Sequence, residues 1–249
     1  MSREADLSQI SDGKKYHAQD CVKINCNDCK GCSACCKGMG DSIVLDPYDI
    51  YNLQKGLNCD FSSLIAQKRI ALHVSKGVIV PHLLLSGENE ACTFLNESNR
   101  CSIHDFRPGF CRLFPLGRAY EEDSFYYFYQ VNECTYPNKS KIKIKDWLSI
   151  PKLPEYEAYI LEWHKIISNL ETIISDYQSE AEQTKEMELI HEKISKLNLM
   201  FLEIFYVNPY DGNASFYEQF AQRDASFVTR PQGGRNKWKA ESFKVLRNM

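Results

Sequence analysis

Cysteines gathered in one short segment are the residues of this sequence best suited to chemistry. Five of its 11 cysteines fall within eleven consecutive positions, and the first four recur at every third residue: Cys26, Cys29, Cys32, Cys35 and Cys36. A Cys-x2-Cys loop lets two thiolates grip one metal ion, and glycines nearby permit the tight turns that such wrapping needs. The segment therefore predicts a thiolate site for iron or zinc.

The spacing within this segment favours an iron–sulfur cluster. Cys26-x2-Cys29-x2-Cys32-x3-Cys36 reproduces the spacing of bacterial ferredoxins, although Lys37 stands where proline normally follows. Zinc stays a close alternative, because four thiolates also make its usual structural site.

A second, more scattered group of cysteines follows later in the chain: Cys92, Cys101, Cys111 and Cys134. Pro108-Gly109 predicts a turn that swings Cys111 inward. Arg107 and Arg112 flank that thiol and are expected to favour its thiolate form. With the first group, these residues supply enough ligands for one cluster plus zinc, or for two four-thiolate sites.

Composition and the termini indicate a cytoplasmic protein with reduced thiols. The N-terminus has no apolar secretory segment, and the longest uncharged apolar stretch, 77–87, falls far short of the ~18 residues that a membrane helix needs. The odd cysteine count argues against complete disulfide pairing. We interpret Cys59 as a buried core cysteine and leave Cys21 undecided. The net charge of -3 gives no sign of nucleic-acid binding.

An ordered set of motifs resembles the YkgJ family of cysteine-cluster (CxxCxxCC) proteins, described as zinc- or iron-chelating. The motifs are Cys29-x2-Cys32-x2-Cys35-Cys36, Cys92-Thr93-Phe94-Leu95, Cys101-Ser102-Ile103-His104 and the run from Arg107 to Leu116. The resemblance spans about residues 26–134. It implies that the metal ligands are Cys29, Cys32, Cys35, Cys36, Cys92, Cys101 and Cys111, with Cys134 as an eighth. His104 stands where many relatives have tyrosine, and we interpret it as a hydrogen-bonding substitute rather than a ligand.

The elements that must position these cysteines read as an α+β fold. Residues 21–40 are expected to form a loop wrapped around the metal, and Ser42–Leu45 a short strand. Asp46-Pro47 predicts the start of a helix that Gly56 ends. A short helix is expected over 61–69, and strands over 71–74, 78–85 and 125–129, which would make a small antiparallel sheet with Cys-rich metal-binding loops.

Past Pro151 the pattern becomes helical. Apolar residues recur at alternating spacings of four and three from Tyr156 to Tyr177 and again from Met187 to Ile204. We predict a helical hairpin, with a new helix starting at a capping box, Ser179 to Glu182. A dimerising coiled coil is the alternative. The expected domains are a flexible N-terminus (1–20), a cysteine-cluster metal-binding domain (21–150), the hairpin (151–208) and an irregular basic tail (209–249).

Three functions from different classes fit these observations. The leading one is a metal- or cluster-binding protein, a function that extends to redox activity if the centre is an iron–sulfur cluster. The second is a protein-lysine N-methylase-like enzyme, because the flagellin methylases share a similar cluster. The third is a structural zinc protein whose hairpin binds a partner protein. The sequence leaves open whether the chain is an enzyme, and His164 and His191 are not counted as ligands.

Overall fold

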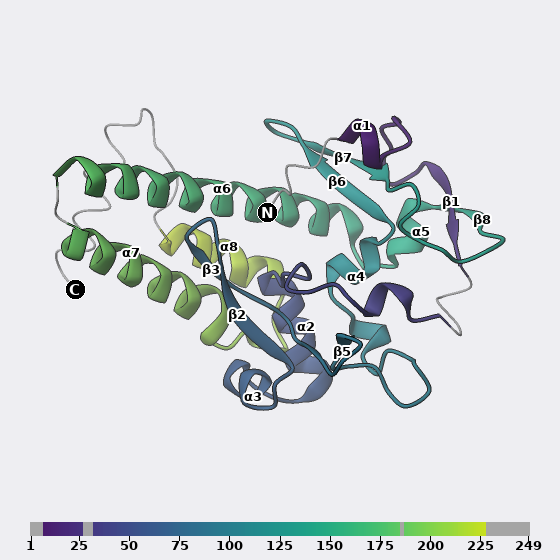
Figure 1. Cartoon of the computed structure of the whole chain (residues 1–249), viewed down its shortest axis with the longest axis horizontal. Helices are drawn as coiled ribbons and strands as arrows, with labels where there is room; N and C mark the ends of the chain where they lie inside the picture. The colour runs from purple at the N-terminus through teal and green to yellow at the C-terminus, as the bar shows by residue number, and fades with distance from the viewer. Residues whose placement is uncertain (1–6, 27–31, 185–186, 228–249) are drawn as a thin grey trace. The chain divides into compact units, whose positions relative to one another are not determined.

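Short helices and paired strands alternate through the first two thirds of the chain, and long helices follow (Figure 1). The computed structural model describes residues 7–26, 32–184 and 187–227. Within these ranges the strands pair as small two-stranded antiparallel sheets, and the C-terminal part is helical. This confirms the expected α+β class. No helix in the same ranges combines the length and apolar character that crossing a membrane requires.

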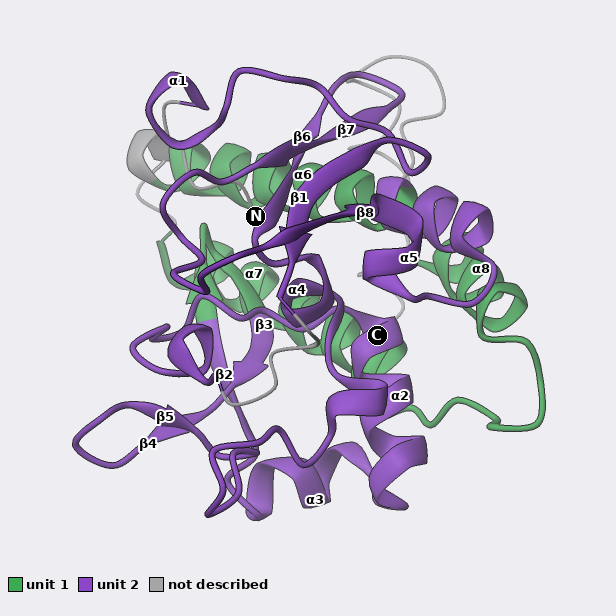
Figure 2. Ribbon diagram, turned by 90° about the vertical axis from the view of Figure 1, so that its right-hand side faces the viewer, with its two compact units in different colours: residues 1, 74–79, 162–249 green, residues 2–73, 80–161 purple. Residues whose placement is uncertain are grey.

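The chain forms two compact units, which Figure 2 colours separately. Unit 2 comprises residues 2–73 and 80–161, and unit 1 comprises residues 74–79 and 162–249. Every cysteine that the structure describes belongs to unit 2.

Unit 2 holds three short ladders that frame the cysteines. They pair β1 (Cys21–Asn25) with β8 (Ser140–Lys143), β4 (Leu85–Ser86) with β5 (Ala91–Cys92), and β6 (Leu116–Tyr120) with β7 (Phe125–Tyr129). The expectation of a loop over 21–40 is wrong at its start. Val22 and Ile24 alternate inward, at 4% and 0% exposure, and this period of two makes the segment a strand.

Helix α2 (Pro47–Leu57) begins where the sequence predicted. The Asp46 side chain accepts the N–H of Asp49, and the Asp49 side chain accepts the N–H of Asp46, so the two residues form a capping box. The predicted stop at Gly56 is wrong. The helix continues to Leu57, and Asn58 closes it in the left-handed conformation (φ 51°). A Cβ at Gly56 would lie 2.6 Å from the ring of Phe106, so glycine at this position serves packing.

The remaining local predictions in unit 2 are mostly confirmed. Helix α3 (Phe61–Ala66) falls in the expected range, and β2 (Ile70–Ser75) and β3 (Val78–Leu83) form a hairpin that continues into unit 1. The strand expected over 42–45 is reduced to one bridge between Val44 and His82. Residues 7–20 include helix α1 (Leu7–Ile10), and Tyr16 pairs with Tyr127 of β7.

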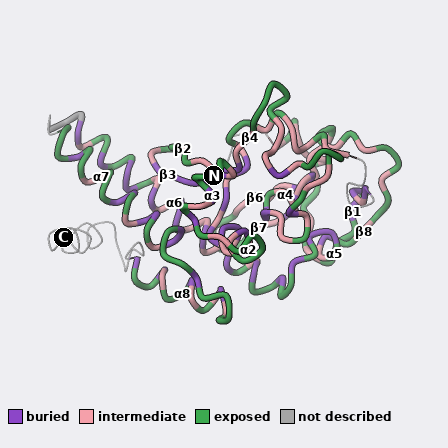
Figure 3. The backbone as a smooth tube through the Cα atoms, turned by 90° about the horizontal axis from the view of Figure 1, so that it is seen from below, coloured by how far each residue is buried: buried purple, intermediate pink, exposed green. Residues whose placement is uncertain are grey.

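The long helices α6 (Leu153–Thr184) and α7 (Met187–Leu202) carry the predicted apolar seams. Every seam residue from Tyr156 to Tyr177 is buried, and Figure 3 shows buried and exposed stretches alternating along both helices. In unit 1, the Trp163 ring stacks on that of Phe201 with centroids 5.6 Å apart. Lys193 lies 5.9 Å from the ring of Tyr177, so the two helices pair as an antiparallel hairpin.

Two details of the hairpin differ from the prediction. Ser179 does not cap a new helix: α6 runs through it, and its hydroxyl donates to Ser175 O at 3.0 Å. Met187, placed in the second seam, is 55% exposed. The coiled-coil alternative loses its basis, because the seams are already buried along most of their length.

An aromatic cluster forms the core of unit 1 beyond the hairpin. Directly after α7, the π-helical turn η4 (Glu203–Val207) fits an extra residue into the helix, so Phe205 and Tyr206 are both fully buried although they are consecutive. Helix α8 (Phe216–Ser226) adds Phe220, whose ring centroid is 5.8 Å from that of Phe205.

The tip of the β2–β3 hairpin is held to α7 by one buried side chain. Asn198, 4% exposed, donates to Gly77 O at 3.0 Å and accepts the N–H of Ile79 at 2.8 Å. Gly77 has φ 82°, and a Cβ there would lie 2.4 Å from Ile174. The tight turn and the close approach therefore both require glycine.

Replacing Asn198 by alanine should destabilise unit 1. The change removes the partner of a partly buried carbonyl and of a partly buried N–H, which costs about 1–3 kcal/mol for the two hydrogen bonds. Urea unfolding followed by tryptophan fluorescence should show the lower midpoint. Leu199→Ala, one residue along and 62% exposed, is the matched control and should change the midpoint little. Equal effects of the two substitutions would contradict the bridging role of Asn198.

Candidate metal centre

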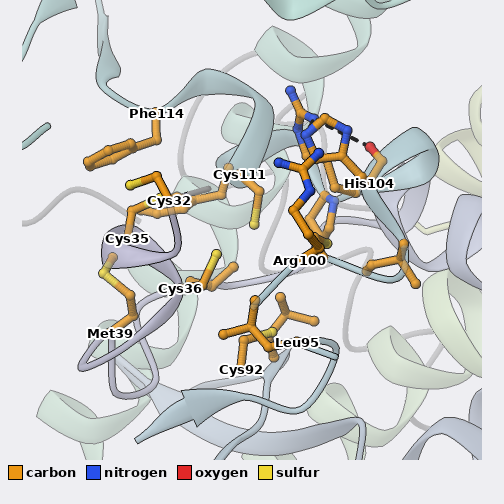
Figure 4. Close-up of a pocket in the computed structure, with 17 residues that line it drawn as sticks. Cys32, Cys35, Cys36, Met39, Cys92, Leu95, Arg100, His104, Cys111 and Phe114 are labelled. Carbon is orange, nitrogen blue, oxygen red and sulfur yellow. Dashed lines mark hydrogen bonds between the residues drawn. The ribbon is translucent and has the colours of Figure 1, made fainter. Parts of the chain in front are cut away.

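Six cysteines from four separate segments of unit 2 face one cavity of about 70 Å³ (Figure 4). They are Cys32, Cys35, Cys36, Cys92, Cys101 and Cys111. The rest of the lining is largely apolar and includes Met39, Leu95 and Phe114. In Figure 4 the sulfur atoms of Cys36 and Cys111 point toward the same region, whereas the sulfur of Cys32 is turned toward Phe114.

Backbone pairing brings the first cysteine segment to Cys92. Cys35 and Cys36 lie on the 3₁₀ turn η2 (Ala34–Cys36). Just after it, Lys37 forms a bridge with Ala91, and Gly38 N donates to Glu90 O at 3.0 Å. Gly38 has φ 67°, which glycine adopts without strain. The thiols of η2 and β5 therefore reach the same cavity.

A second backbone contact returns the chain to the cavity at Cys101. Leu95 and Cys101 form a bridge, and Ser102 N donates to Phe94 O at 2.8 Å. The Asn96 side chain closes the loop between them by accepting backbone N–H groups at 2.9 and 3.0 Å. This closed loop therefore brings Cys101 back to the cavity that Cys92 also lines.

Cys111 is positioned by a buried carboxyl group. It lies on the short helix α4 (Gly109–Leu113), whose first N–H, that of Gly109, donates to Asp49 Oδ1 at 2.7 Å. Asp49 is 3% exposed and belongs to the capping box of α2, so one side chain holds the starts of two helices. A Cβ at Gly109 would lie 2.4 Å from the hydroxyl of Tyr156, which explains the glycine of the Arg107-Pro108-Gly109 motif.

A buried polar cluster surrounds this carboxyl group. Arg118 donates to the Tyr156 hydroxyl at 3.3 Å, and its guanidinium lies 5.5 Å from the centroid of the same ring. Burial and the neighbouring Asp46 carboxyl raise the pKa of Asp49 well above its ordinary value. None of these side chains lines the cavity, so the cluster supports α4 from outside the cavity.

Burial disfavours the thiolate form of three cavity cysteines in the metal-free chain. It raises the pKa of Cys92, Cys101 and Cys111, with neighbouring thiols adding to the effect. Cys111 as a residue is partly exposed, but its sulfur is enclosed by protein atoms. A metal that binds here must displace protons from sulfur.

The flanking arginines act differently from the sequence-based expectation. Arg107 and Arg112 do not hold Cys111 as a thiolate, because burial of its sulfur outweighs them. Arg112 instead donates to Arg107 O at 3.1 Å. Arg107 does oppose the rise in the pKa of another thiol, that of Cys101, so its charge still acts on the cavity.

His104 lines the cavity and is hydrogen-bonded. Arg107 Nη1 lies within hydrogen-bonding distance of both ring nitrogens of His104, and since a guanidinium only donates, the imidazole accepts. This arrangement agrees with the interpretation of His104 as a hydrogen-bonding residue.

A smaller cavity of about 20 Å³ collects the remaining candidate ligands. Cys26 and Cys134 line it together with Cys32 and Cys35. Cys26, 3% exposed, directly follows β1, and Cys134 follows the turn after β7. Lys139 donates to Cys134 O at 2.6 Å and so fixes that segment.

The candidate ligands are thus gathered but not closed around an ion. Cys29 lies outside the described residues. Across the described parts of the chain, no three His, Cys, Asp or Glu side chains adopt a ligating arrangement. Cys21 and Cys59 line neither cavity. The donor set nevertheless fits iron or zinc, because the groups facing the cavities are soft thiols.

Comparison with known proteins finds one family model that matches this part of the chain. Residues 28–142 match the CxxCxxCC family model. That model is described as "Putative zinc- or iron-chelating domain". No curated protein and no solved structure gave a significant match. The match supports metal binding by the cysteines of this range. Residues 28–142 hold eight of the nine candidate ligands, Cys29 among them.

Sequence reasoning missed the residues that position the cavity cysteines and their surroundings. Asp49 could be recognised as the fourth residue of a capping box, but its bond to Gly109 joins positions 60 residues apart. Arg118 and Tyr156 stand in ordinary strand and helix patterns. Arg69 donates to Thr93 O and opposes the rise in the pKa of Cys92, and nothing in its local sequence marks it.

Gly109→Ala should destabilise unit 2 by about 1–3 kcal/mol, because the added methyl group overlaps the Tyr156 hydroxyl. Tyr156→Phe removes that hydroxyl, so Gly109→Ala should cost measurably less in the Tyr156→Phe background. Thermal unfolding of the four proteins of this cycle measures the coupling. Gly212→Ala is the control, since a Cβ there meets nothing within 4 Å. Strict additivity of the two changes would disprove the contact.

Proposed function

We propose that this protein holds a metal centre through cysteine thiolates, with an iron–sulfur cluster as the first choice and zinc as the second. The ligands we propose are Cys26, Cys29, Cys32, Cys35, Cys36, Cys92, Cys101, Cys111 and Cys134. The observation that carries the proposal is the convergence of six thiols from four segments on one cavity. A hydrophobic core without a metal would not explain why six thiols face the same cavity.

The number of thiols exceeds what one ion can use. A tetrahedral zinc ion uses four ligands, whereas eight described cysteines line the two cavities. The ferredoxin-like spacing from Cys26 to Cys36 is the reason for placing the iron–sulfur cluster first. Arg100 and Arg107, both in the cavity lining, would offset the negative charge of several thiolates.

Structural zinc is the second candidate, and one observation favours it. The cavity cysteines come from η2, β5, the 101–104 segment and α4, all of which are short. Metal ligation would tie these elements together, as it does in small zinc-dependent folds.

The setting that we propose is a reducing compartment such as the cytoplasm. All described cysteines are free thiols, and metal ligation needs reduced sulfur. A partner protein on the helical hairpin also stays a proposal: Met187, Leu189 and Leu199 are exposed on α7.

Protein isolated without oxygen should carry iron with acid-labile sulfide and show broad visible absorbance, measured together with its zinc content. Cys111→Ser should lower the bound metal by at least half, because it removes a thiol from the centre of the cavity. Cys59→Ser is the matched control and should retain all of it, since Cys59 lines neither cavity. Stoichiometric zinc without sulfide would contradict the iron–sulfur cluster and favour the structural zinc site. The absence of any metal would refute the proposed function.

A further inference from the structure

The candidate ligands divide between two cavities instead of sharing one. Cys36, Cys92, Cys101 and Cys111 line only the larger cavity, and Cys26 and Cys134 line only the smaller. Cys32, Cys35 and Phe114 line both, so they form the wall between the two. Eight described cysteines are therefore arranged as two overlapping sets.

The two cavities share η2 but otherwise draw on different elements. Besides η2, the larger one is lined by residues of β5 and α4. The smaller one lies where the end of β1 meets the segment between β7 and β8, and the β1–β8 ladder fixes Cys26 there. Trp147 of α5 (Ile144–Leu148) lines the smaller cavity and donates to Phe114 O at 3.2 Å, which holds the wall in place.

We propose that the cysteines form two separate metal sites, the second of which is a four-thiolate zinc site made by Cys26, Cys134 and the wall residues Cys32 and Cys35. This inference rests on the proposed function and deepens it. Cys36, Cys92, Cys101 and Cys111 are left as a complete set of four thiolates for the first site. Four thiolates are the full complement of a structural zinc ion, which needs no open position, and the small, closely lined second cavity suits such an ion.

The experiment counts metal in paired variants of the full chain. Reduced, metal-free protein is titrated with Co²⁺ under nitrogen, and thiolate-to-cobalt absorbance is followed together with the amount bound. The unchanged chain should bind two equivalents. Cys26→Ser/Cys134→Ser and Cys92→Ser/Cys101→Ser should each bind one, and Cys21→Ser/Cys59→Ser, with both thiols outside the cavities, should bind two. A chain that saturates at one equivalent, or a paired variant that binds none, would overturn the two-site division.

A second measurement uses only the unchanged chain, so its result does not depend on whether the variants fold. The protein is alkylated at increasing Zn²⁺, and the protection of each cysteine is read by mass spectrometry. Cys26 and Cys134 should become protected together, at a zinc level different from that for Cys92 and Cys101. Joint protection of all four that is complete at one zinc per chain would overturn the division while leaving thiolate metal binding intact. If neither Co²⁺ nor Zn²⁺ is bound or protects any thiol, the proposed function fails as well.

Discussion

The hydrogen bond from the Gly109 N–H to the Asp49 carboxyl group is the contact on which the geometry of the candidate centre depends. It joins the start of α2 to the start of α4, and α4 carries Cys111. A short helix of five residues cannot hold its own position, since isolated helices of that length are unstable. The buried carboxyl group, the close approach of Tyr156 to Gly109 and the adjacent Arg118 together set where that thiol points.

The larger-scale outline could be predicted from the sequence because it rests on periodic patterns. The seam from Tyr156 to Tyr177 predicted buried helical positions, and the pair Asp46-Pro47 predicted the start of α2. The same local rules failed where a distant residue decides the outcome. Gly56 looked like a helix stop, but it is glycine because the Phe106 ring packs against it. Ser179 looked like a cap, but Tyr177 and Ala181 on either side of it are buried, and α6 continues through it.

For the candidate site, cysteine spacing identified which residues gather, but not how they are divided. Spacing reports local wrapping, so it could group the cysteines of 26–36. It could not place Cys134 beside Cys26, because that placement depends on the pairing of β1 with β8, two strands that are far apart in the sequence. The effect of Arg107 and Arg112 on Cys111 was misjudged for a related reason: sequence adjacency does not reveal how fully a sulfur is enclosed.

The enclosure of these sulfur atoms has a consequence for the lifetime of the newly made chain. Peroxide and disulfides react with the thiolate form of cysteine, and a protonated thiol reacts slowly. Because burial raises the pKa of Cys92, Cys101 and Cys111, a smaller share of each thiol is in the thiolate form than in an exposed cysteine. Clustered thiols would otherwise be prone to sulfenic acid formation and to disulfide exchange among themselves. A raised pKa therefore slows the reaction of these three thiols with oxidants while no metal is bound to them.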